Sequence, residues 1–75
     1  MEKYLDLNGD SGVAAYGIES DAITVEFKGG SLYRYTYASA GKDAIEAMKV
    51  LARSGDGLNS YIRRNVYRDY AAKLR

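Results

Sequence analysis

The chain has 75 residues, a formal net charge of +1, and neither cysteine nor histidine. A chain of this length supplies one domain, which buries only about 60% of the surface that the unfolded chain exposes. The absence of cysteine and histidine excludes disulfides, typical zinc sites, thiol nucleophiles and imidazole bases, while a hydrophobic content of 47% indicates a folded rather than a disordered chain.

The first ten residues, MEKYLDLNGD, are polar and rich in turn-forming residues. We therefore expect residues 1–10 to be a loose lead-in. Asp6, Asn8 and Asp10 have the spacing of the first ligands in a calcium-binding loop, but the position of the bidentate glutamate falls on Gly17. We expect no metal site here and no cofactor.

The segment from residue 12 to residue 37 predicts an antiparallel meander. Hydrophobic and polar residues alternate strictly in residues 22–27, a pattern typical of a half-buried strand. Lys28-Gly29-Gly30 follows and predicts a hairpin turn, because glycine readily adopts the positive φ that such turns need. The three expected strands cover residues 12–19, 22–27 and 31–37.

The third expected strand, SLYRYTY, places Tyr33, Tyr35 and Tyr37 on one face and Arg34 on the other. In one interpretation the rings stack on single-stranded bases across an open sheet face, with Arg34 on phosphate. In the other they line the inner face beneath the helices. We favour the inner face, because a domain with so small a core can hardly leave three large rings exposed.

Helical periodicity begins after Tyr37. Ser39 is the expected N-cap of a first helix, which ends at Ser54-Gly55. A second helix is expected from about Leu58 to Leu74. Its apolar stripe consists of Leu58, Ile62, Val66, Tyr70 and Leu74, and its opposite side carries Arg64, Arg68 and Arg75.

The order β-β-β-α-α predicts a single α+β domain over residues 1–75. We expect a three-stranded antiparallel meander sheet followed by two helices packed on one face, which leaves the other sheet face open. The expected core residues are Phe27, Ile45, Met48, Leu51, Ile62 and Val66.

The charge is unevenly distributed along the chain. Residues 1–52 contain five basic and eight acidic residues, a net charge of −3, whereas residues 53–75 contain six basic and two acidic residues, a net charge of +4. A basic C-terminal segment can contact phosphate, an acidic protein surface, or only water.

Several short motifs resemble those of the KTSC domain, a small module named for the C-terminus of some lysyl-tRNA synthetases. They are Val25-Glu26-Phe27 before a glycine turn, Tyr33-Arg34-Tyr35, and SGDGLNSYIR from Ser54 to Arg63. The chain departs from the family in lacking the Val-Pro step after the Y-x-Y strand, and in having Ile18 at a position that is commonly tyrosine. The resemblance implies a stand-alone bacterial protein for which RNA binding has been suggested.

Two functions are consistent with these observations. The first is a small binding module for RNA or single-stranded nucleic acid, with positioning contacts and stacking rings supplied by Arg34, Arg63, Arg64, Arg68, Tyr33 and Tyr35. The alternative is a protein-interaction or self-association module that uses an edge strand or the open sheet face. A basic surface shared by Arg34 and the helix arginines would favour the first, and a neutral open face the second.

We do not expect an enzyme, because no pair of acidic residues is placed in an evident pocket and no serine has a visible base. The expected partner is RNA or an unknown protein, and the expected state is a monomer or weak homodimer. No apolar run approaches the roughly 20 residues that a membrane span needs, so we expect a soluble, cytoplasmic protein.

Overall fold

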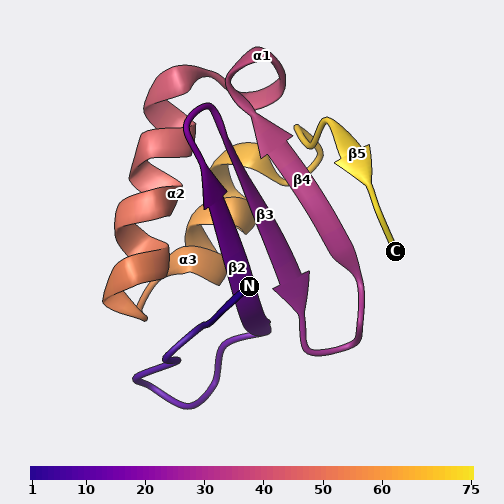
Figure 1. The fold of residues 1–75 in the computed structure, drawn as a ribbon. Coiled ribbons are helices and arrows are strands. Elements are labelled where there is room, and N and C mark those ends of the chain that lie inside the picture. Colours follow the sequence, from indigo (N-terminus) through magenta and orange to yellow (C-terminus); the bar gives the residue numbers. More distant parts are fainter.

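A five-stranded antiparallel sheet, with its strands in chain order, runs through the computed structural model of residues 1–75 (Figure 1). The strands are β1 (Glu2–Lys3), β2 (Val13–Glu19), β3 (Ala22–Phe27), β4 (Leu32–Thr36) and β5 (Ala72–Lys73). The helices are α1 (Tyr37–Ala40), α2 (Lys42–Ser54) and α3 (Leu58–Tyr61), and α3 continues into a π-helical segment, η1 (Ile62–Val66). The predicted α+β class is confirmed, but the sheet has five strands rather than three.

The predicted hairpin between the second and third expected strands is confirmed as β3 and β4. Gly30 turns the chain with a φ of 99°, and its N–H donates to the Phe27 carbonyl at 2.8 Å. In the resulting register Val25 lies opposite Tyr33, and Ile23 lies opposite Tyr35. Since directly paired residues share a face of the sheet, Tyr33 and Tyr35 lie on the same face as the apolar residues of β3.

The N-terminal segment is not a loose lead-in. Glu2 and Lys3 pair with β2, so that β1 forms one edge of the sheet. The Tyr4 ring is buried, and its hydroxyl accepts a hydrogen bond from the Leu58 N–H at 3.3 Å. The prediction failed because a single buried tyrosine in a polar segment gives no periodic signal.

The first helical region is broken into two helices. Thr36, and not the predicted Ser39, is the N-cap of α1: its hydroxyl accepts from the Ser39 N–H while the Ser39 hydroxyl accepts from the Thr36 N–H. Tyr37 consequently begins α1 instead of ending a strand. Gly41, with a φ of 93°, separates α1 from α2, and Gly55 ends α2 in the left-handed conformation.

The predicted second helix begins at Leu58 as expected but ends at Val66, eight residues before the predicted end at Leu74. Beyond it the chain turns back to the sheet and forms β5 along β4. The Ala71 N–H donates to the Arg34 carbonyl and the Leu74 N–H to the Leu32 carbonyl, each at 2.7 Å. These bonds satisfy polar groups that β4 would otherwise expose as an edge strand.

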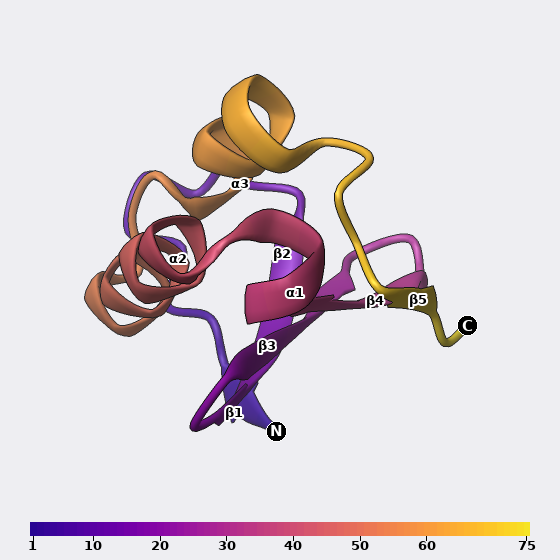
Figure 2. The same cartoon turned by 90° about the horizontal axis from the view of Figure 1, so that it is seen from above.

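All the helices cover one face of the sheet, as predicted (Figure 2). Between the two layers lies a core of buried residues drawn from β2, β3 and β4 and from α2, α3 and η1. Of the expected core residues Ile45, Met48, Ile62 and Val66 are buried, while Phe27 and Leu51 are only partly buried and pack against the core.

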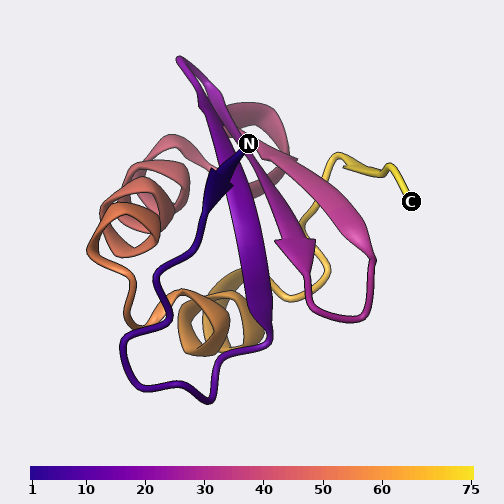
Figure 3. The ribbon, with the colours of Figure 1, turned by 60° about the horizontal axis from the view of Figure 1, so that its bottom comes forward.

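The face of the sheet away from the helices carries Thr24, Glu26 and Arg34, which alternate with the buried residues of their strands. The Arg34 guanidinium binds the Glu19 carboxylate at 2.7 Å, and Arg75 forms an ion pair with Glu26. In each pair the positive charge is offset by a carboxylate of the same chain, so this face is close to neutral. The two chain ends lie at opposite edges of the sheet (Figure 3).

Candidate functional site

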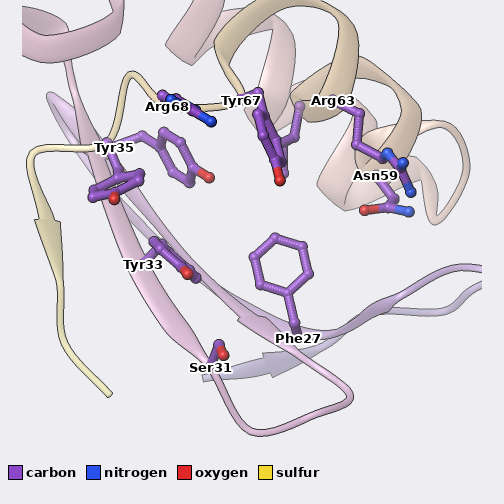
Figure 4. A pocket seen from close by; sticks show the side chains of 10 residues that line it. Phe27, Ser31, Tyr33, Tyr35, Asn59, Arg63, Tyr67 and Arg68 are labelled. Atoms are coloured by element: carbon purple, nitrogen blue, oxygen red, sulfur yellow. The ribbon is translucent and has the colours of Figure 1, made fainter.

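A pocket of about 540 Å³ opens between the helix-covered face of the sheet and the segment that follows α3 (Figure 4). Its volume lies in the range of about 300–1,000 Å³ that is usual for sites of small ligands. The pocket is lined by Phe27, Ser31, Tyr33, Tyr35, Asn59, Ile62, Arg63, Tyr67, Arg68 and Tyr70.

Half of the ten lining residues are aromatic, and the fold places them there from both sides. Strand alternation directs Phe27, Tyr33 and Tyr35 to the helix-covered face. The return of the chain from η1 to β5 then lays the Tyr70 ring across β4, with its centroid 4.8 Å from that of Tyr33 and 6.3 Å from that of Tyr35. These contacts and the Phe27–Tyr33 contact at 5.8 Å are edge-to-face, a favoured geometry for aromatic pairs.

Tyr67 differs from the other rings in that it is largely exposed. Its relative exposure is 63%, compared with 2% for Tyr35 at the inner end of the wall. Its hydroxyl is directed toward Phe27 across the pocket (Figure 4). The Tyr67 ring is therefore available for contact with a ligand, and little of its surface contributes to the protein core.

Two arginines on the helical side supply the positive charge of the pocket. Arg63 belongs to η1, and Arg68 lies two residues beyond the end of that segment. Neither guanidinium forms an ion pair or a hydrogen bond with the protein, although Arg68 lies over the Tyr67 ring at 6.0 Å. No acidic residue lines the pocket. The site therefore presents free positive charge beside aromatic faces.

The interior of the pocket disfavours negative charge on Tyr35. Burial raises the pKa of Tyr35 to about 12, with smaller contributions from Tyr33, Tyr70 and the Asp69 carboxylate. The Tyr35 hydroxyl remains protonated at neutral pH and makes no hydrogen bond within the protein. It is thus a neutral hydrogen-bonding group at the inner end of the pocket.

Four of the six predicted site residues converge here, namely Tyr33, Tyr35, Arg63 and Arg68. Arg34 lies on the opposite face of the sheet and is paired with Glu19, and Arg64 is exposed on η1 without lining the pocket. Arg34 and the helix arginines therefore do not share the continuous basic surface that the nucleic-acid hypothesis expected from the sequence. Nor do Arg64, Arg68 and Arg75 form a single helix face, because the helix ends before Arg68.

The sequence interpretation missed six of the ten lining residues, including Ser31 and Ile62, which it had placed in a strand and in the core. Tyr67 and Tyr70 had been placed in a helix that does not extend so far, and Phe27 had been placed in the core. Asn59 had been noted only as part of a motif. The resemblance motifs carried a usable signal, since the pocket gathers six of their residues: Phe27, Tyr33, Tyr35, Asn59, Ile62 and Arg63.

No group of three or more acidic side chains is placed to hold a metal ion. The Asp6 carboxylate, part of the calcium-like spacing, instead accepts hydrogen bonds from Lys28 Nζ at 2.7 Å and the Ser11 N–H at 3.0 Å, and these bonds lower its pKa. None of the helices combines the length and the apolar character that crossing a membrane requires.

The fold and pocket define a small α+β domain with an aromatic, arginine-bearing pocket. Comparison with protein-family models, with curated proteins and with solved structures gives no match.

Proposed function

We propose that this domain is a binding module for single-stranded nucleic acid, RNA in the first instance, rather than an enzyme. The observation that carries the proposal is the combination of five aromatic rings and two unpaired arginines in a pocket without a carboxylate. Aromatic faces bind unstacked bases, with each stacked base worth about 1–3 kcal/mol, and arginines bind the adjoining phosphates.

The contacts differ in one respect from those expected from the sequence. Arg34 makes no contribution, because it lies behind the sheet and is neutralised by Glu19. Arg63 and Arg68 are the phosphate contacts, and Arg64 adds to the positive field from the exposed side of η1. The motifs that resemble the KTSC domain supply part of this pocket, and membership of that family and a cytoplasmic location are part of the proposal.

A salt titration tests the proposal. Each phosphate contact contributes about 0.7 to the slope of log affinity against log salt for a single strand. Binding of a labelled oligoribonucleotide to the double variant Arg63→Gln/Arg68→Gln should therefore have a slope smaller in magnitude by about 1.4. The matched control is Arg34→Gln/Arg53→Gln, which removes the same charge away from the pocket and should leave the slope nearly unchanged.

Absence of binding at low salt, or an equal change of slope in both double variants, would exclude this site. The protein-interaction alternative would then take precedence. Two observations support it. The open face of the sheet is close to neutral, because Arg34 is paired with Glu19 and Arg75 with Glu26, and a neutral open face is the arrangement expected to favour this alternative. In addition, β1 pairs with β2 only as far as Tyr16, so residues 17–19 have no strand partner on that side. Sedimentation of the purified protein over a range of concentrations would test self-association through this edge.

A further inference from the structure

Exposure to solvent falls across the pocket from its helical side to its strand side. Figure 4 shows Arg63, Tyr67 and Arg68 on the helical side, and all three are exposed. Tyr35 on β4 is only 2% exposed and lies at the inner end. No basic residue other than the two arginines lines the pocket. Both free positive charges therefore belong to its outer part, and its inner end has none.

The hydroxyl of Tyr35 is the polar group at that inner end, and it has no partner in the protein. Other tyrosine hydroxyls are engaged: that of Tyr4 accepts from the Leu58 N–H at 3.3 Å, and that of Tyr37 donates to the Glu46 carboxylate at 2.6 Å. No fully buried side-chain nitrogen or oxygen of the protein lacks a hydrogen-bond partner. The Tyr35 oxygen therefore keeps a small exposed surface, and since the residue lines the pocket, this surface is open to a ligand there.

The surroundings of this hydroxyl suit a flat, uncharged group. The Tyr70 ring lies edge-to-face with Tyr35, at 6.3 Å between centroids, and packs in the same way on Tyr33. The Asp69 carboxylate contributes to the raised pKa of Tyr35, although burial is the main cause. The same negative charge would repel a phosphate brought to this hydroxyl. An anionic part of a ligand is thus disfavoured here, whereas a planar ring can pack against the aromatic side chains.

We infer that a nucleotide enters this pocket base first, with an edge of its base hydrogen-bonded to the Tyr35 hydroxyl and its phosphate left at the two arginines. The inference rests on the proposed function and adds the orientation of the ligand to it. The base is the part of a nucleotide farthest from the phosphate, so it is the part that reaches the inner end. A tyrosine hydroxyl both donates and accepts, and every base carries hydrogen-bonding groups on its edge, so this contact favours no particular base. Tyr35 acts through its hydroxyl and not as a stacking ring, because its ring is covered.

The test measures binding of short oligouridine and of oligodeoxyuridine of equal length to Tyr35→Phe at two salt concentrations. Loss of one hydrogen bond to the base should weaken both ligands by the same factor, about 2–12-fold. The slope of log affinity against log salt should remain that of the wild type, because the hydroxyl is uncharged. The matched control is Tyr16→Phe, since Tyr16 is also buried but lies outside the pocket, and this variant should keep wild-type affinity. Melting curves should show that Tyr35→Phe is no less stable than the wild type, because its hydroxyl bonds to nothing in the protein.

Wild-type affinity in Tyr35→Phe, or an equal loss in Tyr16→Phe, would overturn the inference while leaving the proposed function intact. Two further outcomes would also overturn the base-first orientation. A loss of affinity, or binding itself, confined to oligouridine would assign the contact to the ribose 2′-hydroxyl, and a salt slope smaller in magnitude in Tyr35→Phe would assign it to a phosphate. Failure of the wild-type protein to bind either oligonucleotide at low salt would instead overturn the proposed function, and the inference with it.

Discussion

The ammonium group of Lys49 donates a hydrogen bond to the backbone carbonyl of Ser20 at 2.8 Å, which joins α2 to the turn between β2 and β3. Lys49 is 6% exposed, an unusual burial for lysine. Its Nζ also binds the Glu46 carboxylate at 2.7 Å and lies 5.6 Å from the centre of the Tyr37 ring. A charged group is thus accommodated at the junction of the two layers because several partners surround it.

Replacing Lys49 with methionine keeps most of the side-chain volume and removes these polar contacts. Hydrogen bonds from a charged group are worth about 1–3 kcal/mol, and we expect a loss of roughly 2 kcal/mol of unfolding free energy. For a domain of this size the Tm should fall by roughly 8–16 °C. Lys42→Met, at an exposed position of the same helix, is the control and should change the Tm little. Equal melting of the two variants would show that the Lys49–Ser20 contact does not stabilise the fold.

Glu46 should make the stability of the protein sensitive to acid. Its carboxylate accepts from Lys49 Nζ at 2.7 Å and from the Tyr37 hydroxyl at 2.6 Å, and these bonds lower its pKa below the ordinary value of 4.5. A lowered pKa means that the contribution is present above about pH 4.5 and is lost as the pH falls through the folded value. Urea unfolding of Glu46→Gln should depend less on pH in this range than unfolding of the wild type. Superimposable pH profiles would contradict the assignment.

Gly55 occupies a position that other residues would strain. It ends α2 with a φ of 76°, and a Cβ added to it would lie 2.6 Å from Leu5 Cβ. Gly55→Ala should therefore cost about 1–2 kcal/mol for the left-handed backbone, and more for displacement of Leu5. Gly29→Ala is the matched control, because Gly29 is not in the left-handed region and an added Cβ meets nothing within 4 Å. Chemical denaturation of both variants measures the difference, and equal stabilities would be inconsistent with this geometry.

The sequence was sufficient for those elements whose periodicity agrees with their tertiary environment. The hairpin of β3 and β4 and the helix α2 follow from alternation, from the glycine turn and from 3.6-residue spacing. The prediction of a helix was wrong for the segment after Val66, because Tyr70 and Leu74 continue the helical spacing although this segment is not helical. Hydrogen bonds to the edge of β4 and the contact between Tyr70 and Tyr33 stabilise a strand instead, and local patterns contain no information on either.

The candidate site was predictable to a similar extent. The inward direction of Tyr33 and Tyr35 followed from the limited core of a short chain, and the same alternation already places Arg34 on the opposite face. Tyr67 and Tyr70 were not predictable as pocket residues, since they line it only because the chain reverses after η1. A pocket that depends on such a reversal becomes visible only in three dimensions.

Tyr35 should make the protein lose stability at alkaline pH. Its folded pKa is raised from 10.0 to about 12 because burial disfavours the phenolate. A raised pKa of this acid means that its contribution is present below about pH 10 and is lost as the pH rises toward about 12. Tyr35→Phe removes a hydroxyl that makes no hydrogen bond within the protein, so this variant should fold and should lose less stability over that interval. Parallel losses in denaturant unfolding of the two proteins would contradict the prediction.

Substitution of Tyr67 should weaken nucleic-acid binding without lowering the stability of the fold. Tyr67 and Val50 are both 63% exposed, but only Tyr67 lines the pocket. Exposed substitutions usually change stability by less than about 0.5 kcal/mol, so Tyr67→Ala and Val50→Ala should both melt close to the wild type. A base stacked on Tyr67 contributes about 1–3 kcal/mol, and Tyr67→Ala should therefore weaken oligouridine binding by roughly 5–150-fold while Val50→Ala leaves it unchanged. The measurement is a fluorescence anisotropy titration at one salt concentration, since the two variants carry the same charge as the wild type. Wild-type affinity in Tyr67→Ala would show that bound nucleotides do not use this ring, and equal weakening in both variants would place the binding surface outside the pocket.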